Sequence, residues 1–194
     1  MKYSDIYRLY STSQPKDAIH QALREVPVDD SDEQYEDRSP LHLACQYGDT
    51  EGVKILLERD AEPNTKDANG STPIHILGRT SAGCADEDKL KEIAVVLMEH
   101  GANIPRSAKN TTALIECIRN RHFKMAEAII DSGARVNSTD LNGENVLFGF
   151  CAASGDIRRD IRFAKKELDE SVQYRYPENK IEEIRRSEEH TSEL

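Results

Sequence analysis

A four-residue pattern recurs along this 194-residue chain at a nearly constant interval. Ser39-Pro40-Leu41-His42 is followed 33 residues later by Thr72-Pro73-Ile74-His75. Thr112-Ala113-Leu114-Ile115 begins 40 residues after that, and Asn145-Val146-Leu147-Phe148 begins another 33 residues on. A period of 33 residues, interrupted once, is typical of an array of small structural units that stack on one another.

Each copy of the pattern has the residue types that begin an α-helix. Pro40 and Pro73 occupy the first helical position, where a missing N–H costs nothing and a fixed φ favours the helix. Just before two of the copies, Asn69-Gly70 and Asn142-Gly143 predict a tight turn with positive φ angles. Residues that can accept a hydrogen bond from the first turn of the helix predict N-caps at Ser39, Thr72, Thr112 and Asn145.

A second apolar segment in each unit ends at a residue suited to the left-handed conformation that closes a helix. Gly101 and Gly133 hold this position in two units, and Asp60 holds it in the first clear unit. Asp tolerates positive φ better than most side chains but less well than glycine, so we expect a slightly less stable helix end at Asp60. A unit of one turn and two short helices cannot bury its apolar faces alone, so it must stack on its neighbours.

This arrangement resembles the ankyrin repeat. The resemblance is carried by SPLHLACQYGDTEGVKILLERDAEPN at 39–64 and by DANGSTPIHIL at 67–77. It implies an all-α fold, an ankyrin-repeat α-solenoid of stacked helix-turn-helix units with short β-hairpin loops. It also implies that the motif histidines hydrogen-bond near the turn and tie adjacent repeats together. The structural positions of the repeat motif are Ser39, Pro40, His42, Gly70, Thr72, Pro73, His75, Gly101, Thr112, Gly133 and Gly143.

The matches divide the chain into consecutive units. We expect a degenerate or capping repeat at 1–34, repeat 1 at 35–66, repeat 2 at 67–106 with an inserted loop at 78–88, repeat 3 at 107–139, and an atypical, truncated repeat 4 at 140–185. The amphipathic segment 158–172 is either the outer helix of repeat 4 or an insertion. The last nine residues, RSEEHTSEL at 186–194, resemble the translation of a sequencing adapter. We interpret them as an artefactual tail and expect the native chain to continue with further repeats.

Composition limits the classes of function. The net charge is −10 and no long Lys/Arg block occurs, which argues against a nucleic-acid partner. The N-terminus lacks an apolar signal region, and no window approaches the roughly 18 apolar residues of a membrane helix. We therefore expect a soluble, monomeric protein of the cytoplasm. The chain has four cysteines, Cys45, Cys84, Cys117 and Cys151, and without an export signal their even number does not indicate disulfides. Three of them fall at nearly the same place in the repeat, on the apolar side of a helix, so we interpret them as small core residues rather than metal ligands.

No arrangement of residues indicates catalysis, a cofactor or a metal site. The segment GRTSAG around Ser81 does not place its serine at the centre of GxSxG, and no strand precedes it. His20, His100 and His122 lack Cys, Asp or Glu partners at recognisable metal spacing, so we expect solvated or helix-end positions for them. Neither a phosphate loop of the GxxxxGK type nor HExxH is present. We therefore expect a protein that is not an enzyme.

These features predict a module that binds another protein through the concave face of an ankyrin stack. In ankyrin proteins the contacts come from variable positions that flank the turn and end the first helix. The matching positions here are Tyr35, Glu36, Arg38, Gln46, Tyr47, Ala68, Asn69, Ser71, Arg79, Thr80, Lys109, Thr111, Arg119 and Asn120. Tyr47, Arg79 and Arg119 lead this set because Tyr and Arg dominate interface energetics. The alternative is an accessory interaction region of a larger enzyme or effector whose C-terminal part is missing.

Overall fold

The computed structural model describes residues 1–80, 86–103 and 112–134. Over these ranges the chain forms eight α-helices and one 3₁₀ turn, and no strand. The elements are α1 (Tyr3–Ser11), α2 (Lys16–Glu25), η1 (Glu33–Tyr35), α3 (Pro40–Gln46), α4 (Thr50–Glu58), α5 (Pro73–Arg79), α6 (Glu87–Glu99), α7 (Ala113–Arg119) and α8 (Phe123–Asp131). Predictions for 135–194, including repeat 4, Gly143 and the tail, lie outside the described residues.

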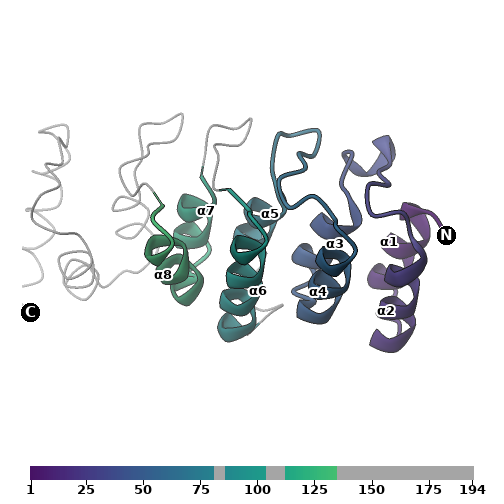
Figure 1. Ribbon diagram of the computed structural model, residues 1–194, viewed down its shortest axis with the longest axis horizontal. Helices are drawn as coiled ribbons and strands as arrows, with labels where there is room; N and C mark the ends of the chain where they lie inside the picture. The colour runs from purple at the N-terminus through teal and green to yellow at the C-terminus, as the bar shows by residue number, and fades with distance from the viewer. Residues whose placement is uncertain (81–85, 104–111, 135–194) are drawn as a thin grey trace, which may run out of the picture.

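The helices form two parallel layers that run along the long axis of the molecule (Figure 1). The inner layer is α1, α3, α5 and α7, and each of these helices packs against the next. The outer layer is α2, α4, α6 and α8, which pack on one another in the same order. The connections from α2 to α3 and from α4 to α5 lie along the upper edge in Figure 1. The all-α stack predicted from the period is confirmed.

Local sequence signals produce the helix ends. Ser39, Thr72 and Thr112 are the N-caps of α3, α5 and α7, and Pro40 and Pro73 open the first two of these helices. A proline is accommodated there because the N–H that it lacks has no partner within the helix. The predicted N-cap at Asn145 lies outside the described residues.

The predicted left-handed helix ends are confirmed as well. Asp60, Gly101 and Gly133 have φ angles of 62°, 87° and 90°. In each case the next residue donates its backbone N–H to a carbonyl five residues back, which closes the last turn of the helix. Asp60 is therefore the one member of this set that holds a side chain in the left-handed region.

The turn before α5 differs from the prediction in one respect. Gly70 has a positive φ of 65°, whereas Asn69 does not, so the pair supplies one left-handed residue and not two. Asp67 organises the turn, because its Oδ1 atom accepts hydrogen bonds from the backbone N–H groups of Asn69 (2.9 Å) and Ser71 (2.8 Å). These two hydrogen bonds from the Asp67 side chain hold the turn closed although only one of its residues has a positive φ.

The segment between α5 and α6 is shorter than the predicted loop at 78–88. Gly78 and Arg79 belong to α5, and Glu87 and Asp88 belong to α6. The Asp86 side chain caps α6 by accepting a hydrogen bond from the backbone N–H of Asp88 (3.1 Å). The two helices therefore extend into the predicted loop from both ends. A hydrogen bond from the Thr80 N–H to the Leu77 carbonyl ends α5, and the Asp86 cap begins α6.

A continuous apolar core fills the space between the two layers. Inner-layer residues Leu41 and Ile74 and outer-layer residues Leu56 and Leu97 are fully buried. Burying a leucine or isoleucine side chain in this way contributes roughly 1.5–3 kcal/mol. The buried set also includes the two cysteines that the structure describes, Cys45 and Cys117, which are unpaired and lie in the core as predicted.

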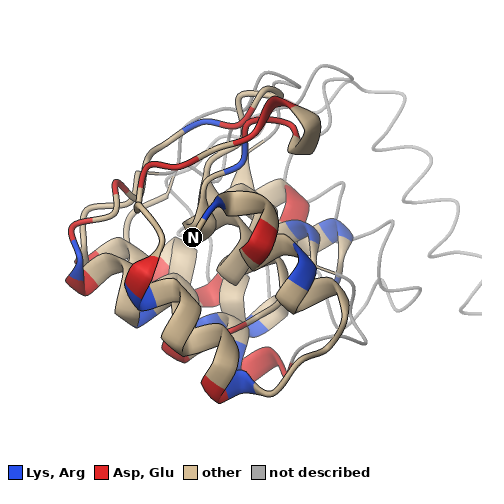
Figure 2. Ribbon diagram, turned by 90° about the vertical axis from the view of Figure 1, so that its right-hand side faces the viewer, with Lys and Arg blue, Asp and Glu red and all other residues tan. Residues whose placement is uncertain are grey.

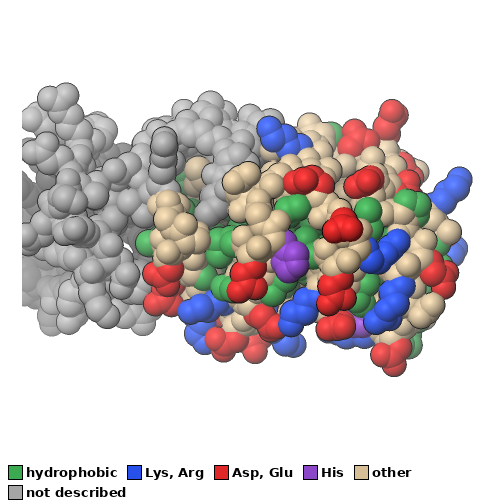
Figure 3. Space-filling view, in the orientation of Figure 1, with side chains coloured by type: hydrophobic (Ala, Val, Ile, Leu, Met, Phe, Trp, Pro, Cys, Tyr) green, Lys and Arg blue, Asp and Glu red, His purple; other side chains and the backbone are tan. Residues whose placement is uncertain are grey.

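Ion pairs link successive outer helices. Lys54 Nζ lies 2.7 Å from Glu92 Oε1 between α4 and α6, and Lys124 Nζ lies 2.7 Å from Asp88 Oδ1 between α8 and α6. Acidic and basic side chains are intermixed along this edge of the molecule (Figure 3). Because these pairs are exposed to solvent, each contributes little to the stability of the stack. None of the described helices has the length and apolar character needed to cross a lipid bilayer.

Candidate partner-binding face

The structure brings the residues predicted at the ends of the first helices into two rows. Gln46, Arg79 and Arg119 are the last residues of α3, α5 and α7, and so form one row along the inner layer. The next residue in each repeat forms a second row at the C-caps, which consists of Tyr47, Thr80 and Asn120. Stacking at a constant register is what turns these separate sequence positions into continuous rows.

Accessibility varies from residue to residue within both rows. Tyr47 is 37% exposed, and Arg119 is also exposed. Gln46, Arg79 and Asn120 are half-buried. Thr80 is buried at 6% exposure, and its hydroxyl donates to the carbonyl of Ile76 (3.3 Å). Thr80 therefore presents no free side chain to a partner.

The predicted positions in front of the helices are also unequal. Glu36 and Ala68 are exposed, and Tyr35, Arg38 and Asn69 are half-buried. Ser71 is fully buried, so this predicted contact is closed off from a partner in the folded chain. Lys109 and Thr111 lie outside the described residues.

In repeats 1 and 2, the residue just before the N-cap forms a hydrogen bond with the last residue of the inner helix. The arginine stands at the first of these positions in repeat 1 and at the second in repeat 2. In repeat 1 the Arg38 guanidinium donates to Oε1 of Gln46 (2.8 Å), and in repeat 2 the Arg79 guanidinium donates to the hydroxyl of Ser71 (3.0 Å). Arg38 and Ser71 occupy the same position of the repeat, just before the N-cap. Each pair therefore joins the turn to the end of the inner helix.

The same arginines connect neighbouring repeats. Arg79 Nε lies 3.1 Å from Glu116 Oε1 on α7, which is an ion pair between two partly buried side chains. Arg38 Nε lies 3.7 Å from Asp67 Oδ2, and the Asp67 side chain is fully buried. Asn120 donates its side-chain amide to the carbonyl of Gly78 (3.0 Å). These links fix the spacing of the face before any partner arrives.

His42 sets the register between repeats 1 and 2. Its Nε2 atom lies 3.0 Å from the carbonyl oxygen of Ser71, which can only accept, so Nε2 carries the proton and donates. Nδ1 then accepts from the backbone N–H of Ser39 (3.1 Å). Burial lowers the pKa of His42 to about 4, from an ordinary value of 6.5, so the neutral ring required by these bonds is the stable form.

His75 has the equivalent place in repeat 2. Its Nδ1 atom lies 2.9 Å from the hydroxyl of Thr72 and 3.3 Å from the backbone nitrogen of the same residue. Both motif histidines are fully buried within the stack. Their contacts show how the recurring histidine links a helix to its own turn, and His42 extends this link to the next unit.

The ankyrin family model, described as "Ankyrin repeats (many copies)", matches residues 22–77. The chain is an ankyrin repeat protein. Three relatives agree with this assignment. The chain is 38% identical over 69 residues to a Caenorhabditis elegans homologue of transient receptor potential cation channel subfamily A member 1, a match covering 36% of this chain and 6% of that protein.

The other two relatives are mouse proteins. Rabankyrin-5 is 34% identical over 115 residues, which cover 57% of this chain and 9% of the relative. Neurogenic locus notch homolog protein 1 is 31% identical over 134 residues, which cover 69% of this chain and 5% of the relative. In all three cases the match therefore spans a small fraction of the relative's own length.

Several ankyrin-stack contacts were missed by the sequence analysis. Asp49 is buried at the N-cap of α4, where it accepts hydrogen bonds from the hydroxyl of Tyr10 (2.8 Å) and from Nε2 of His20 (3.0 Å). His122 has the same place at α8 and donates from Nε2 to the carbonyl of Thr80 (2.6 Å). The prediction of solvated or helix-end positions is therefore wrong for His20, which lies within α2, although His100 is an exposed C-cap as predicted.

The described residues contain no cluster of side chains suited to binding a metal ion. Within 1–80, 86–103 and 112–134, no group of three or more His, Cys, Asp or Glu side chains is placed to hold a metal ion. Burial raises the pKa values of the Cys45 and Cys117 thiols well above their ordinary range. Both thiols are therefore kept protonated, and a protonated thiol is a poor nucleophile and a poor ligand.

Proposed function

We propose that this ankyrin stack is a non-catalytic module that binds a partner protein through its concave face. Ankyrin repeats are generally protein-interaction modules. The observation that carries the proposal is the pair of rows at the ends of α3, α5 and α7, where exposed Tyr47 and Arg119 stand on a layer of fixed spacing. A rigid face loses little conformational entropy when it binds, which leaves more of the contact energy as affinity.

Within this proposal Tyr47 and Arg119 are the main contacts, because they are exposed and belong to residue types that dominate interface energetics. Arg79 has a second role, since its guanidinium joins Ser71 and Glu116. Gln46, Asn120, Tyr35, Glu36, Arg38 and Asn69 form the half-buried or peripheral part of the same face. We further propose that the protein acts as a monomer in the cytoplasm.

Site-specific photo-crosslinking tests this proposal. A benzophenone side chain is placed at Tyr47 or Arg119, and, as matched controls, at the exposed outer-helix residues Glu58 or Glu99. We expect one partner protein to be crosslinked from the two inner positions and not from the two outer ones. Crosslinking from the outer positions alone would overturn the choice of face. A second experiment measures partner capture by the triple variant Tyr47→Ala, Arg79→Ala, Arg119→Ala together with its helical content. Reduced capture with unchanged helical content shows that contacts were lost and not the fold.

A second possibility is that these repeats serve a larger protein that has another activity. The lengths of the relatives favour it, since the matched region makes up 5 to 10% of each of the first five. Reading the complete open reading frame tests this directly. A further domain would make the stack an accessory region, whereas additional repeats alone would support a dedicated binding protein.

A further inference from the structure

Five of the seven tyrosines of the chain gather at the N-terminal end of the stack. Tyr3, Tyr7 and Tyr10 come from α1, Tyr35 comes from η1, and Tyr47 caps α3. The rings of Tyr7 and Tyr35 are 4.3 Å apart, and those of Tyr10 and Tyr47 are 4.8 Å apart and nearly parallel at 11°. These ring contacts form two groups, one of Tyr3, Tyr7 and Tyr35 and one of Tyr10 and Tyr47. Tyr7 and Tyr10 are three residues apart on α1, which places the two groups on the same face of this helix.

The cluster has a buried floor and an accessible rim. Tyr3 and Tyr10 are 1% and 6% exposed, whereas Tyr7 and Tyr35 are half-buried and Tyr47 is 37% exposed. We call Tyr7, Tyr35 and Tyr47 the tyrosine patch. Stacking on Tyr10 holds the ring of Tyr47 in place, so a ligand does not have to immobilise it. Together with Met1, Tyr47 is one of two exposed large apolar side chains among the described residues.

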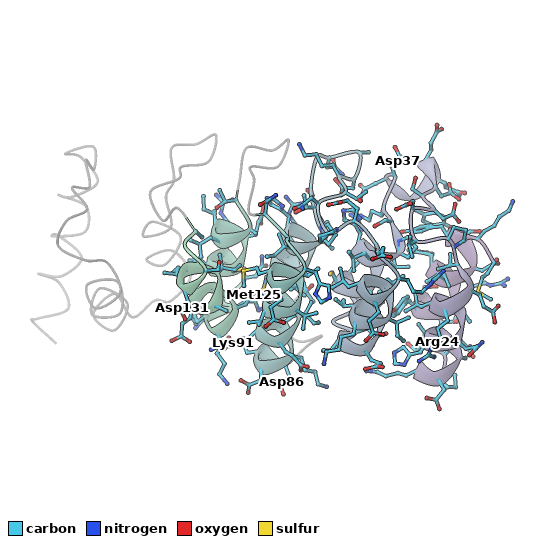
Figure 4. The ribbon with its side chains drawn as sticks, in the orientation of Figure 1. Arg24, Asp37, Asp86, Lys91, Met125 and Asp131 are labelled. Carbon is cyan, nitrogen blue, oxygen red and sulfur yellow. The ribbon has the colours of Figure 1, made fainter. Side chains whose placement is uncertain are left out.

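An acidic segment borders the patch. Residues 29–37, DDSDEQYED, contain six carboxylates and no Lys or Arg, and Tyr35 itself lies within this segment. Figure 2 shows the red residues along the loop above α1, and Figure 4 places Asp37 at the turn edge, opposite Arg24 and Asp86. The nearest arginine in sequence, Arg38, is already paired with Glu36. The segment therefore leaves the patch next to an excess of negative charge.

Part of this charge is not used by the fold. Asp30 accepts from the backbone N–H of Tyr3 (2.7 Å), and Asp32 caps η1 through Gln34 (2.9 Å). Within the described part of the chain, the side chains of Asp29 and Glu33 make no hydrogen bond or ion pair. The floor also contains an unused polar atom, because the hydroxyl of Tyr3 is buried without a hydrogen-bond partner among the described residues.

We propose that the tyrosine patch and its acidic border bind an arginine-bearing, extended segment of a partner protein. A guanidinium can stack flat on a tyrosine ring while its N–H groups point outward to carboxylates. The border supplies those carboxylates and attracts the cation before contact. Lysine fits less well because its ammonium is compact and strongly hydrated. This inference rests on the proposed function, since it gives the chemical class of one partner segment for the concave face.

The test measures binding of a dye-labelled Gly/Ser nonapeptide with three arginines to the full chain, by fluorescence anisotropy at low salt. Reference peptides carry three lysines or three citrullines, the latter being neutral and similar in shape to arginine. We expect the arginine peptide to bind tightest and the citrulline peptide weakest. Equal binding of the arginine and lysine peptides would overturn the role of ring stacking, and equal binding of the citrulline peptide would overturn the role of charge.

Variants then locate the site. We expect Tyr47→Leu to weaken arginine-peptide binding about twofold to fivefold, the range for exposed cation–π contacts, and Tyr47→Phe to keep it. Asp29→Asn with Glu33→Gln should weaken binding without affecting folding, because neither side chain has a structural contact. Glu58→Gln with Glu99→Gln removes the same charge from the outer helices and is expected to have little effect. An equal loss in this control would show nonspecific attraction and overturn the site.

The outcomes also separate this inference from the proposed function. Photo-crosslinking from Tyr47 and Arg119 with no arginine-dependent peptide binding would leave the concave face as an interaction surface and would refute the arginine specificity. Conversely, arginine-dependent binding that is weakened in Tyr47→Leu but unchanged in Arg119→Ala would place this segment at the N-terminal end of the face. Thermal unfolding of each variant shows that the losses are not caused by misfolding.

Discussion

Replacing His42 should reduce the stability of the stack at neutral pH and have little effect in acid. The ring is fully buried and neutral, with Nε2 donating to Ser71 and Nδ1 accepting from Ser39. His42→Leu removes both bonds and leaves the N–H of Ser39 without its acceptor. Two bonds at about 0.5–1.5 kcal/mol each, with one stranded donor, give a loss of about 2–4 kcal/mol at pH 7.

Acid changes this difference in a defined direction. The pKa of His42 is about 4 in the folded chain and 6.5 in its ordinary state, so between these values the unfolded chain binds a proton that the folded chain does not. Unfolding therefore becomes easier as the pH falls through this window. A difference of about 2.5 pKa units corresponds to about 3 kcal/mol of stability that is present above pH 6.5 and lost on approaching pH 4.

The assay is urea unfolding followed by circular dichroism at several pH values between 4 and 7.5. We expect the wild type to lose about 3 kcal/mol more than His42→Leu over this range, so that the two free energies of unfolding converge in acid. Arg38 and Asp67, which also influence the pKa of His42, are present in both proteins. A difference between wild type and variant that stays constant with pH would refute the argument that a buried neutral imidazole holds the two repeats in register.

Three further predictions concern single positions. Asp60→Gly should raise the free energy of unfolding by up to about 1 kcal/mol, because glycine adopts the φ of 62° without strain; a lower melting temperature would contradict this. Gly52→Ala should lower the free energy of unfolding in urea by about 1–3 kcal/mol, although alanine has the better helix propensity. The reason is that the added Cβ would lie 2.7 Å from Asp49 Oδ2 and 2.9 Å from Leu23 Cδ1. The buried, protonated Cys45 and Cys117 thiols should resist iodoacetamide at pH 8 until denaturant is added, as peptide mass spectrometry can show, and fast native labelling would argue against their core positions.

The features predicted correctly from the sequence are those that depend on interactions between residues only a few positions apart. Ser39, Thr72 and Thr112 cap their helices because a cap bond spans only three residues. Gly101 and Gly133 end helices because the left-handed conformation is a property of the residue itself. The 33-residue period predicted the stacking, since equal units can bury their apolar faces only on one another.

The features that were missed depend on which surfaces the stacking brings together. Ser71 and Thr80 resemble ordinary turn and loop residues in the sequence, yet the stack buries both. His20 has no partner at a recognisable metal spacing in the sequence, but folding places Asp49 against it from another repeat. No local signal encodes such contacts, because they depend on how far one repeat is shifted and rotated relative to the next.

The sequence by itself therefore determined the unit of this protein, its helix ends and the fact that the units must stack. Each of these follows from bonds within one repeat or from apolar area that a single repeat cannot cover. Only the tertiary structure decided which polar side chains are consumed in holding repeats together and which are left to bind. It joined Arg79 to Glu116 and brought Tyr35 and Tyr47 against the tyrosines of α1, since contacts between repeats are fixed by packing geometry and not by neighbours in the chain.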